Sequence, residues 1–230
     1  MAPMRVWLAW SSGKDSAWAL HRLRQRPELR VEALVTTLNE VHDRVARHAV
    51  RDSLVRRQAQ ALGLPLRVVP LPDPCPNRVY EERMAQVLAE ARAEGVGHMA
   101  FGDLFLEDVR AYRERQLAGT GITPLFPLWG LDTDRLAHEM VEAGLRAWIT
   151  CVDPRRLARS FAGRCFDAAL LDALPAEVDP CGEHGEFHTF VWKGPGFASP
   201  LGVRPGTVVE RGGFVFADLE PVAEGPHAGP

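Results

Sequence analysis

The stretch Trp10-Ser11-Ser12-Gly13-Lys14-Asp15-Ser16 decides the fold that we expect for this chain of 230 residues. Before it, residues 4–10 are apolar apart from Arg5 and do not alternate, as expected of a parallel strand buried on both faces. After it, residues 16–24 carry the apolar spacing of a helix. A glycine-bearing turn between a buried strand and a helix presents backbone N–H groups to an anion, and the helix dipole adds to the attraction. The stretch therefore predicts an α/β fold with a phosphate-binding turn behind its first strand.

Strands and helices continue to alternate beyond this turn. We expect strands over residues 31–38, 66–69 and 98–101, and helices over residues 44–62 and 76–94. The first of these helices rests on apolar residues at every fourth position from Ala46 to Leu54. Such alternation implies right-handed βαβ crossovers and a parallel sheet, in which ligands bind at the carboxyl ends of the strands. The turn at 10–16, Thr36-Thr37 and Gly102-Asp103 all fall at that edge.

The composition of the chain changes beyond Gly119, because proline, tryptophan and glycine residues interrupt the regular pattern of strands and helices up to Gly130. We expect helices over residues 132–143, capped by Asp132 or Thr133, and 166–174, and strands over 146–152, 187–192, 207–211 and 214–219. Gly212-Gly213 would join the last two strands as a hairpin. We place a boundary near residue 130, which gives domains over 1–130 and 131–220 and a disordered tail over 221–230.

The composition narrows the class of protein. Hydrophobic residues make up 46% of the chain and charged residues 25%, as in soluble proteins. No segment approaches the ~20 apolar residues of a membrane span, and the first ten residues lack a signal-peptide cleavage site. We therefore expect a cytoplasmic protein without a membrane partner. The net charge of −3 argues against a nucleic-acid partner, and the four cysteines lack the spacing of a zinc site.

Three phosphate-binding motifs can be compared with the turn. A Walker A loop would need glycine where Leu8 stands and serine or threonine where Asp15 stands, and the dinucleotide pattern G-x-G-x-x-G is absent. The turn matches S-G-G-x-D-S instead, the loop of ATP pyrophosphatases, with Ser12 in place of the first glycine. This loop type predicts that ATP is bound and cleaved between its α- and β-phosphates. A plain polar turn with a serine cap is the structural alternative.

The turn also contains a carboxylate. Ser11, Ser12, Gly13, Lys14 and Ser16 can donate hydrogen bonds to phosphates, but Asp15 would repel them unless a cation intervenes. We therefore favour Mg²⁺ bridging at Asp15 over a structural bond to the loop backbone.

Two further groups of polar residues follow predicted strands. Residues 101–114 include Gly102, Asp103, Glu107, Arg110 and Tyr112, and their alternative reading is an exposed helix with ion pairs such as Glu107–Arg110. In residues 179–189, two glycines would let Glu183, Glu186 and His188 converge to orient an amine, deprotonate it or hold a second Mg²⁺. A hydrated polar loop is the alternative there, and a nucleophilic role for Cys181 is not expected because no cysteine partner is near.

Together these motifs resemble the diphthine–ammonia ligase-like proteins of the N-type ATP pyrophosphatase, or adenine nucleotide α-hydrolase, superfamily. The turn at 11–16, Phe101-Gly102-Asp103, Pro127-Leu128-Trp129 and residues 182–189 occur in the order and approximate spacing of that family. The resemblance covers roughly residues 4–200. It implies a Rossmann-like five-stranded parallel sheet and a smaller mixed α+β C-terminal substrate domain.

The resemblance also implies a reaction and its residues. ATP with Mg²⁺ would adenylate a carboxylate and release pyrophosphate, and ammonia would then displace AMP to leave an amide. Lys14, Asp15, Glu183, Glu186 and His188 would be catalytic. ATP would bind at Trp10, Ser11, Ser12, Gly13, Lys14, Asp15, Ser16, Thr36, Thr37, Gly102 and Asp103, with adenine near the backbone of Thr36-Thr37. The acceptor would face Asp103, Glu107, Arg110, Tyr112, Gly182, Glu183 and Glu186.

Other functions remain open. Enzymes that modify tRNA use the same loop, although this chain lacks the paired cysteines of thiolation and a basic surface. An ATP-binding sensor without turnover is a third interpretation. The acceptor, a protein side chain or a small molecule, is not identified by the sequence, and the chain could act as a homodimer. Diphthine occurs in archaeal and eukaryotic elongation factor 2, so a bacterial chain would need another carboxylate.

Overall fold

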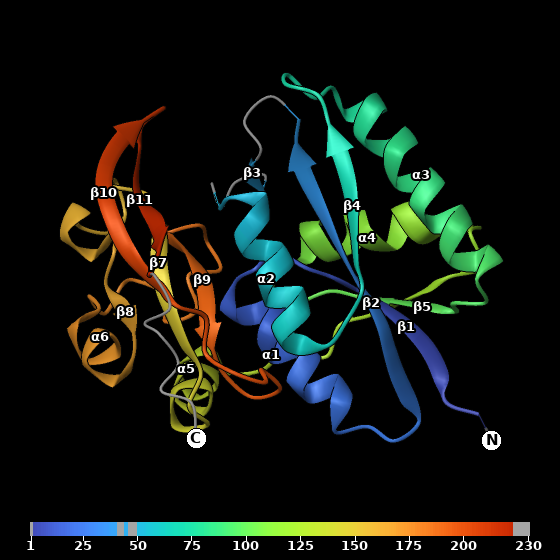
Figure 1. The fold of residues 1–230 in the computed structure, drawn as a ribbon, viewed down its shortest axis with the longest axis horizontal. Helices are drawn as coiled ribbons and strands as arrows, with labels where there is room; N and C mark the ends of the chain where they lie inside the picture. The colour runs from blue at the N-terminus through green and yellow to red at the C-terminus, as the bar shows by residue number, and fades with distance from the viewer. Residues whose placement is uncertain (1, 41–43, 46–49, 223–230) are drawn as a thin grey trace, which may run out of the picture.

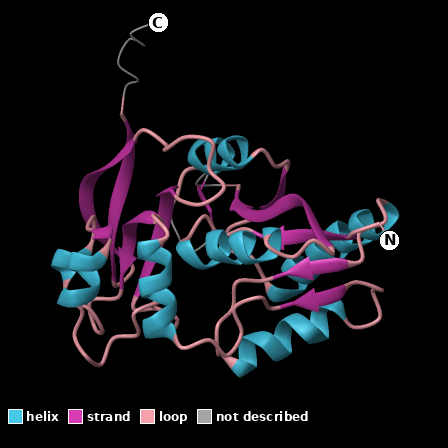
Figure 2. Cartoon of the chain, turned by 90° about the horizontal axis from the view of Figure 1, so that it is seen from below, coloured by secondary structure: helices cyan, strands magenta, loops and turns pink. Residues whose placement is uncertain are grey.

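The computed structural model describes residues 2–40, the backbone of residues 44–45, and residues 50–222. They form two β-sheets that stand side by side, with helices between them and on their outer faces (Figure 1). Figure 2 shows the same two groups of strands from below. Among the described helices, none is both long enough and apolar enough to cross a membrane.

The first sheet contains five parallel strands. They are β1 (Met4–Ala9), β2 (Leu29–Asn39), β4 (Leu66–Leu71), β5 (His98–Ala100) and β6 (Thr123–Leu125), and the intervening helices are α1 (Lys14–Arg24), α2 (Asp52–Leu62), α3 (Asn77–Ala93) and α4 (Glu107–Leu117). The spatial order β4-β2-β1-β5-β6 makes β1 and β5 the flanks of the switch point where open α/β sheets bind ligands. The Rossmann-like five-stranded parallel sheet is confirmed.

Both faces of the first sheet are covered, as the apolar sequence of β1 predicted. Successive strand residues point to opposite faces. Val6 and Leu8 pack with α1 and α2 on the face toward the second sheet, whereas Trp7 packs with α3 and α4 on the other face. All three side chains are at most 2% exposed. This two-sided burial explains why hydrophobic residues do not alternate along β1.

The second sheet is antiparallel and comes from the later part of the chain. It contains β7 (Arg146–Val152), β8 (Cys165–Phe166), β9 (Phe187–Lys193), β10 (Val203–Arg211) and β11 (Phe214–Pro221), with α5 (Thr133–Glu142), the 3₁₀ helix η1 (Arg159–Phe161) and α6 (Ala168–Ala173). The central strand β7 pairs with β8, β9 and β11. Gly212 and Gly213 form the predicted hairpin turn, with φ of 59° and 80°. Asp132 caps α5 by accepting a hydrogen bond from the Arg135 N–H at 2.9 Å.

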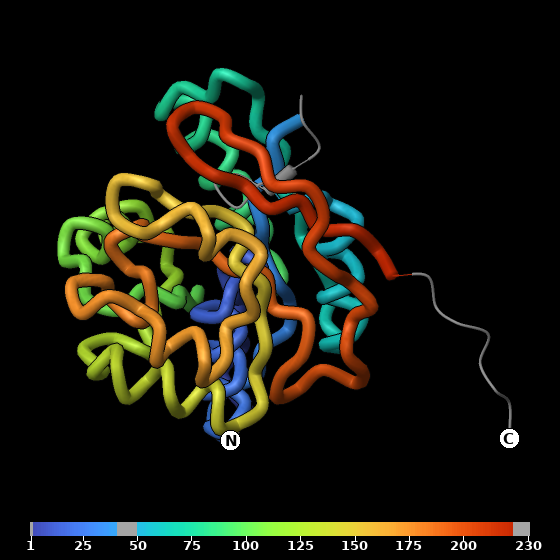
Figure 3. The backbone as a smooth tube through the Cα atoms, turned by 90° about the vertical axis from the view of Figure 1, so that its left-hand side faces the viewer, coloured from blue at the N-terminus to red at the C-terminus, as the bar shows by residue number. Residues whose placement is uncertain are grey.

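The two sheets share one hydrophobic core. Its largest cluster includes Leu8 of β1, Leu54 of α2 and Phe190 of β9. Figure 3 shows the orange and red C-terminal chain passing in front of the blue N-terminal chain. Packing therefore continues across the boundary predicted near residue 130, and the division into domains over 1–130 and 131–220 stays a prediction.

The helix predicted over residues 44–62 is wrong at its start. It begins at Asp52, and Arg44–Val45 form a short strand, β3, that pairs antiparallel with the end of β2. Val50 is buried at 3% exposure although it lies outside the helix, so apolar spacing alone misled the prediction. Residues 46–49 lie outside the described part of the chain.

Other elements also differ from the sequence-based expectation, among them β8, which was not predicted and includes Phe166, where a helix was expected to begin. Strand β6 was not predicted, because it is three residues long and contains Pro124. At the end of the chain, Pro221 belongs to β11 and not to the predicted tail, whereas residues 223–230 lie outside the described residues.

Candidate active site

A cavity of about 340 Å³ opens at the carboxyl edge of the first sheet, beside the switch point between β1 and β5. The end of β1, the start of α1, β2, the segment after β5, α3, α4 and the start of β9 all contribute to its wall. The predicted site residues that line it are Trp10, Ser11, Lys14, Asp15, Ser16, Thr36, Thr37, Gly102, Asp103, Gly182, Glu183 and His188. The fold thus brings the motifs of both halves of the sequence to one cavity.

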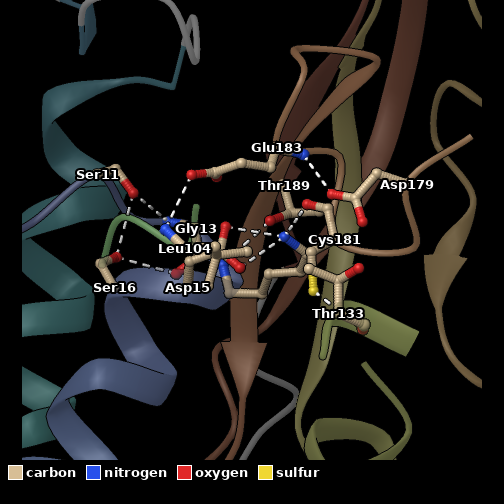
Figure 4. Close-up of polar contacts among 11 residues, drawn as sticks. Ser11, Gly13, Asp15, Ser16, Leu104, Thr133, Asp179, Cys181, Glu183 and Thr189 are labelled. Carbon is tan, nitrogen blue, oxygen red and sulfur yellow. Dashed lines mark hydrogen bonds and ion pairs between the residues drawn. The ribbon is translucent and has the colours of Figure 1, made fainter. Parts of the chain in front are cut away.

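The first turn of α1 presents hydrogen-bond donors to this cavity. Helix geometry leaves the N–H groups of Asp15 and Ser16 without intrahelical partners, and the N-cap residue, Gly13, has no side chain that could cap them. The Ser11 hydroxyl accepts a hydrogen bond from the Gly13 N–H at 3.3 Å and lies 3.2 Å from the Ser16 hydroxyl (Figure 4). Backbone and hydroxyl donors at a helix N-terminus form a site suited to phosphate.

The Lys14 side chain lies between this turn and the second sheet, with its ammonium 5.8 Å from the centre of the Phe166 ring. Its side chain is 2% exposed, and the ammonium donates hydrogen bonds to both carboxylate oxygens of Asp15 at 2.8 Å and to the Cys181 carbonyl (Figure 4). Burial acts to lower the pKa of Lys14, but the attraction of Asp15 and other anionic groups raises it overall. Through these hydrogen bonds, Lys14 connects the turn at residues 10–16 to the loop before β9, which contains Cys181.

Gly102 brings the end of β5 into contact with α1. A Cβ atom at this position would lie 3.0 Å from the carbonyl carbon of Asp15 and 3.0 Å from the Ser16 nitrogen. Asp103 follows, with its carboxylate 3.7 Å from Nε of Arg113. Burial raises the pKa of Asp103, and the Arg113 guanidinium opposes that rise.

We expect Gly102→Ala to lower the free energy of unfolding by about 2 kcal/mol, because an overpacked methyl group would press on backbone atoms that cannot rotate away. Gly97→Ala is the matched control, since a Cβ atom there meets nothing within 4 Å. Urea denaturation of both variants measures the difference. Equal stability of the two variants would show that the contact between β5 and α1 is not tight.

Glu183 is held at the cavity by two backbone contacts. One of its carboxylate oxygens accepts a hydrogen bond from the Leu104 N–H at 2.9 Å, and its own N–H donates to the Asp179 carboxylate at 2.7 Å (Figure 4). Burial raises the pKa of Glu183 to about 7, with the Leu104 N–H opposing the rise and the charge of Asp15 adding to it. A carboxyl group with this pKa can exchange a proton at neutral pH.

Glu186 and His188 occupy different positions from each other. Glu186 is 2% exposed and does not line the cavity, and its carboxylate accepts a hydrogen bond from the Asp179 N–H at 3.4 Å. His188 lines the cavity, and its carbonyl accepts a hydrogen bond from the Thr150 hydroxyl at 3.3 Å. Glu186 therefore contacts the backbone of its own loop and does not face the cavity. The catalytic roles of both residues stay predictions.

Three predicted acceptor residues on α4 lie outside the cavity wall. Arg110 pairs with Glu114 at 2.8 Å and lies 4.7 Å from the centre of the Trp129 ring. Tyr112 faces a second cavity, between α3 and α4. Glu107 is an exposed residue in the first turn of α4. The alternative interpretation of an exposed helix with ion pairs describes this face of α4, with Arg110–Glu114 as its pair.

The cavity face of α4 consists of Leu106, Val109 and Arg113 instead. These residues follow the spacing i, i+3 and i+7, which places them on one side of a helix. That spacing could have identified Arg113 from the sequence. Tyr80 and Met84, one turn apart on α3, also line the cavity and were not predicted. Nothing in their surroundings in the sequence distinguishes them from ordinary core residues.

Cys181 lines the cavity but remains a thiol. It is 1% exposed, its sulfur lies 3.5 Å from the Thr133 carbonyl oxygen, and burial raises its pKa far above neutrality. A protonated and enclosed sulfur is a poor nucleophile. This geometry agrees with the expectation that Cys181 does not attack a substrate.

Asp15 is the predicted magnesium ligand. Within residues 2–40, 44–45 and 50–222, no three His, Cys, Asp or Glu side chains are arranged to hold a metal ion. Magnesium is commonly bound by one or two carboxylates together with substrate phosphates. An ion at Asp15 would therefore take further ligands from phosphates beside the first turn of α1, and this role stays a prediction.

The wall of the cavity is mainly apolar in the part that lies away from α1. Val35, Met99 and Phe101 provide apolar surface, and Thr36 lies beside them at 2% exposure. The Thr36 hydroxyl has no hydrogen-bond partner among the described residues. Apolar side chains with a few buried polar groups suit a planar ring, so this part of the wall could accommodate one.

Two family models match the chain. The one described as the diphthamide synthase N-terminal domain matches residues 4–123, and the one described as the diphthamide synthase C-terminal domain matches residues 132–214. No curated protein matches the chain significantly.

Proposed function

The chain belongs to the diphthamide synthase family, and from this premise we propose that it is an AMP-forming ligase that converts a carboxylate to an amide with ATP and ammonia. The observation that carries the proposal is the cavity in which the donors at the start of α1 lie together with Glu183. ATP supplies an electrophilic α-phosphorus to the acceptor carboxylate, with pyrophosphate as the leaving group, and ammonia then displaces AMP. The acceptor belongs to a protein side chain or a small molecule.

The start of α1 binds the departing pyrophosphate in this proposal. The N–H groups of Asp15 and Ser16 and the hydroxyl groups of Ser11 and Ser16 stabilise its negative charge. Asp15 would hold Mg²⁺, whose charge would offset the repulsion between its carboxylate and the phosphates. Lys14 keeps Asp15 in place through their ion pair of 2.8 Å.

The middle of the cavity binds the nucleoside. The backbone of Thr36-Thr37 in β2 contacts adenine, and Met99 and Phe101 provide apolar surface for its ring. The Thr36 hydroxyl, which is buried, hydrogen-bonds to the nucleoside. Adenine at β2 and phosphates at α1 leave the α-phosphate near the loop that carries Glu183.

Glu183 accepts the proton of the nitrogen donor. At neutral pH ammonia is present mainly as ammonium, which must lose a proton before nitrogen can attack the acyl carbon. The Leu104 N–H orients the carboxylate of Glu183, and its pKa of about 7 leaves a large fraction of it ionised at neutral pH. Glu183 therefore serves as the general base for ammonium.

Product analysis tests the proposal. The chain is incubated with ATP, Mg²⁺, ammonium and acceptor probes, namely free carboxylic acids and diphthine-bearing elongation factor 2, and phosphorus NMR follows the nucleotides. The proposal expects AMP and pyrophosphate in equal amounts, with an amide formed only when ammonium is present. Formation of ADP and phosphate would exclude it.

A further inference from the structure

Gln58 is a buried polar residue that ties the phosphate turn to the second sheet. It lies on the buried face of α2 at 0% exposure. Its amide oxygen accepts a hydrogen bond from the Trp10 indole N–H at 2.9 Å. Its amide nitrogen donates to the Ser12 carbonyl at 3.0 Å and to the Val191 carbonyl at 2.7 Å. One side chain thus connects the end of β1, the turn and β9.

The Ser12 carbonyl is the informative partner of Gln58. Ser12 has a φ of 71°, a left-handed conformation that disfavours residues other than glycine. Its carbonyl accepts a second hydrogen bond from the Val191 N–H at 3.0 Å. In a trans peptide the C=O and the following N–H point in opposite directions. Holding the Ser12 carbonyl against β9 therefore turns the Gly13 N–H toward the Ser11 hydroxyl, which accepts its hydrogen bond and lines the cavity.

We propose that Gln58 is a positioning residue of this turn, which keeps the Ser12–Gly13 peptide oriented so that the Ser11 hydroxyl, held by the Gly13 N–H, and not a carbonyl, faces a bound pyrophosphate group. The inference rests on the proposed function, because it assumes that the turn binds the phosphates of ATP. Gln58 acts through Ser12 and does not line the cavity itself. Without Gln58, rotation of the peptide would release Ser12 from its left-handed conformation and point a carbonyl dipole at the anion.

Gln58→Met tests the inference with inorganic pyrophosphate and Mg²⁺ as the probe. Methionine has a similar length but cannot form any of the three hydrogen bonds. We expect the dissociation constant of the Gln58→Met variant for pyrophosphate, measured by calorimetry, to be about tenfold or more above that of the wild type. Gln60→Met is the matched control, because Gln60 is exposed on the same helix and its substitution should leave the dissociation constant unchanged.

Two further variants separate positioning from a purely structural role. Ser12→Gly in the Gln58→Met background should recover most of the lost affinity, because glycine occupies the left-handed conformation without a steric penalty. Gln58→Glu should bind pyrophosphate better at low pH than at high pH. Its buried carboxyl group can donate one hydrogen bond while protonated and repels the Ser12 and Val191 carbonyls once ionised. This variant also tests the inference if Gln58→Met does not fold.

A crystal structure of a folded Gln58 variant completes the experiment. We expect the Ser12–Gly13 peptide to be rotated, with Ser12 outside the left-handed region. A pyrophosphate affinity within about twofold of the wild-type value, an unchanged Ser12 conformation, or a double variant no better than Gln58→Met would each overturn the inference. A wild-type chain that binds pyrophosphate but forms no AMP would refute the proposed function alone, because the affinity and the peptide orientation do not depend on turnover.

Discussion

Glu183→Gln is expected to lower kcat for amide formation from ammonium by about 100-fold, the lower end of what a general base contributes. The amide side chain keeps the size of the carboxylate and can still accept the Leu104 N–H hydrogen bond of 2.9 Å. It cannot accept a proton from ammonium. The affinity for ATP should change by less than about twofold, because the substitution removes an interaction made during the reaction and not in the nucleotide complex.

Hydroxylamine provides the discriminating control for this prediction. It is largely neutral at neutral pH, so it brings no proton that must be removed before attack. Glu183→Gln should therefore retain most of its turnover with hydroxylamine while losing turnover with ammonium. An equal loss with both nucleophiles would show that Glu183 binds the acceptor or stabilises the fold and is not the base.

The pH dependence follows from the pKa of Glu183, which burial raises to about 7. If the ionised form is the base, as proposed, kcat with ammonium should rise with pH through about 7 and level off above it. The rise centred on this pH should be absent from Glu183→Gln. A wild-type profile that falls through the same range would contradict the assignment, because it would require the protonated form.

Lys14→Met is expected to reduce the free energy of unfolding by about 3 kcal/mol, the lower end of the cost of removing one partner from a buried ion pair. The lower end applies because the Asp15 side chain is 27% exposed, whereas that of Lys14 is 2% exposed. The substitution leaves the Asp15 carboxylate without its cation and the Cys181 carbonyl without its donor. Denaturation with urea measures the change.

The chain contains its own control for this experiment. Lys193 is its other lysine and is exposed, so Lys193→Met should alter the stability by no more than about 0.5 kcal/mol. Asp15→Asn combined with Lys14→Met should be more stable than Lys14→Met alone, because no unpaired charge remains. If the double variant were the less stable of the two, the ion pair would not account for the burial of Lys14.

The phosphate turn and its sheet were predictable because their signals are local. A buried strand, a glycine-bearing turn and a helix follow one another directly over residues 4–24, and backbone geometry connects them. The same reasoning located Thr36-Thr37 and Gly102-Asp103 at the edge of the sheet, where they line the cavity. The residues at 182–189 could be recognised as a polar cluster, but their place beside α1 could be predicted only through family resemblance, since it depends on packing between the two sheets.

Residues whose roles depend on contacts distant in the sequence were not predicted. Gln58 bonds to residues 46 and 133 positions away, so no local pattern could identify its partners. Its position was nevertheless visible, because it stands between Leu54 and Leu62 in the buried stripe of α2. A polar residue within such a stripe needs hydrogen-bond partners. On α4, Arg110 and Tyr112 were predicted as site residues because of their polar side chains. Helical spacing from Leu106 would have predicted Arg113, which lines the cavity.

The proposed function requires this cavity to bind ATP with its α-phosphate at the loop that carries Glu183. A crystal structure with Mg²⁺ and α,β-methylene-ATP, which cannot be cleaved between these phosphates, tests it most directly. We expect the β- and γ-phosphates to contact the N–H groups at the start of α1, adenine to lie at Thr36-Thr37, and the α-phosphate to face Glu183. A nucleotide bound elsewhere, or one whose γ-phosphate faces Glu183, would contradict it.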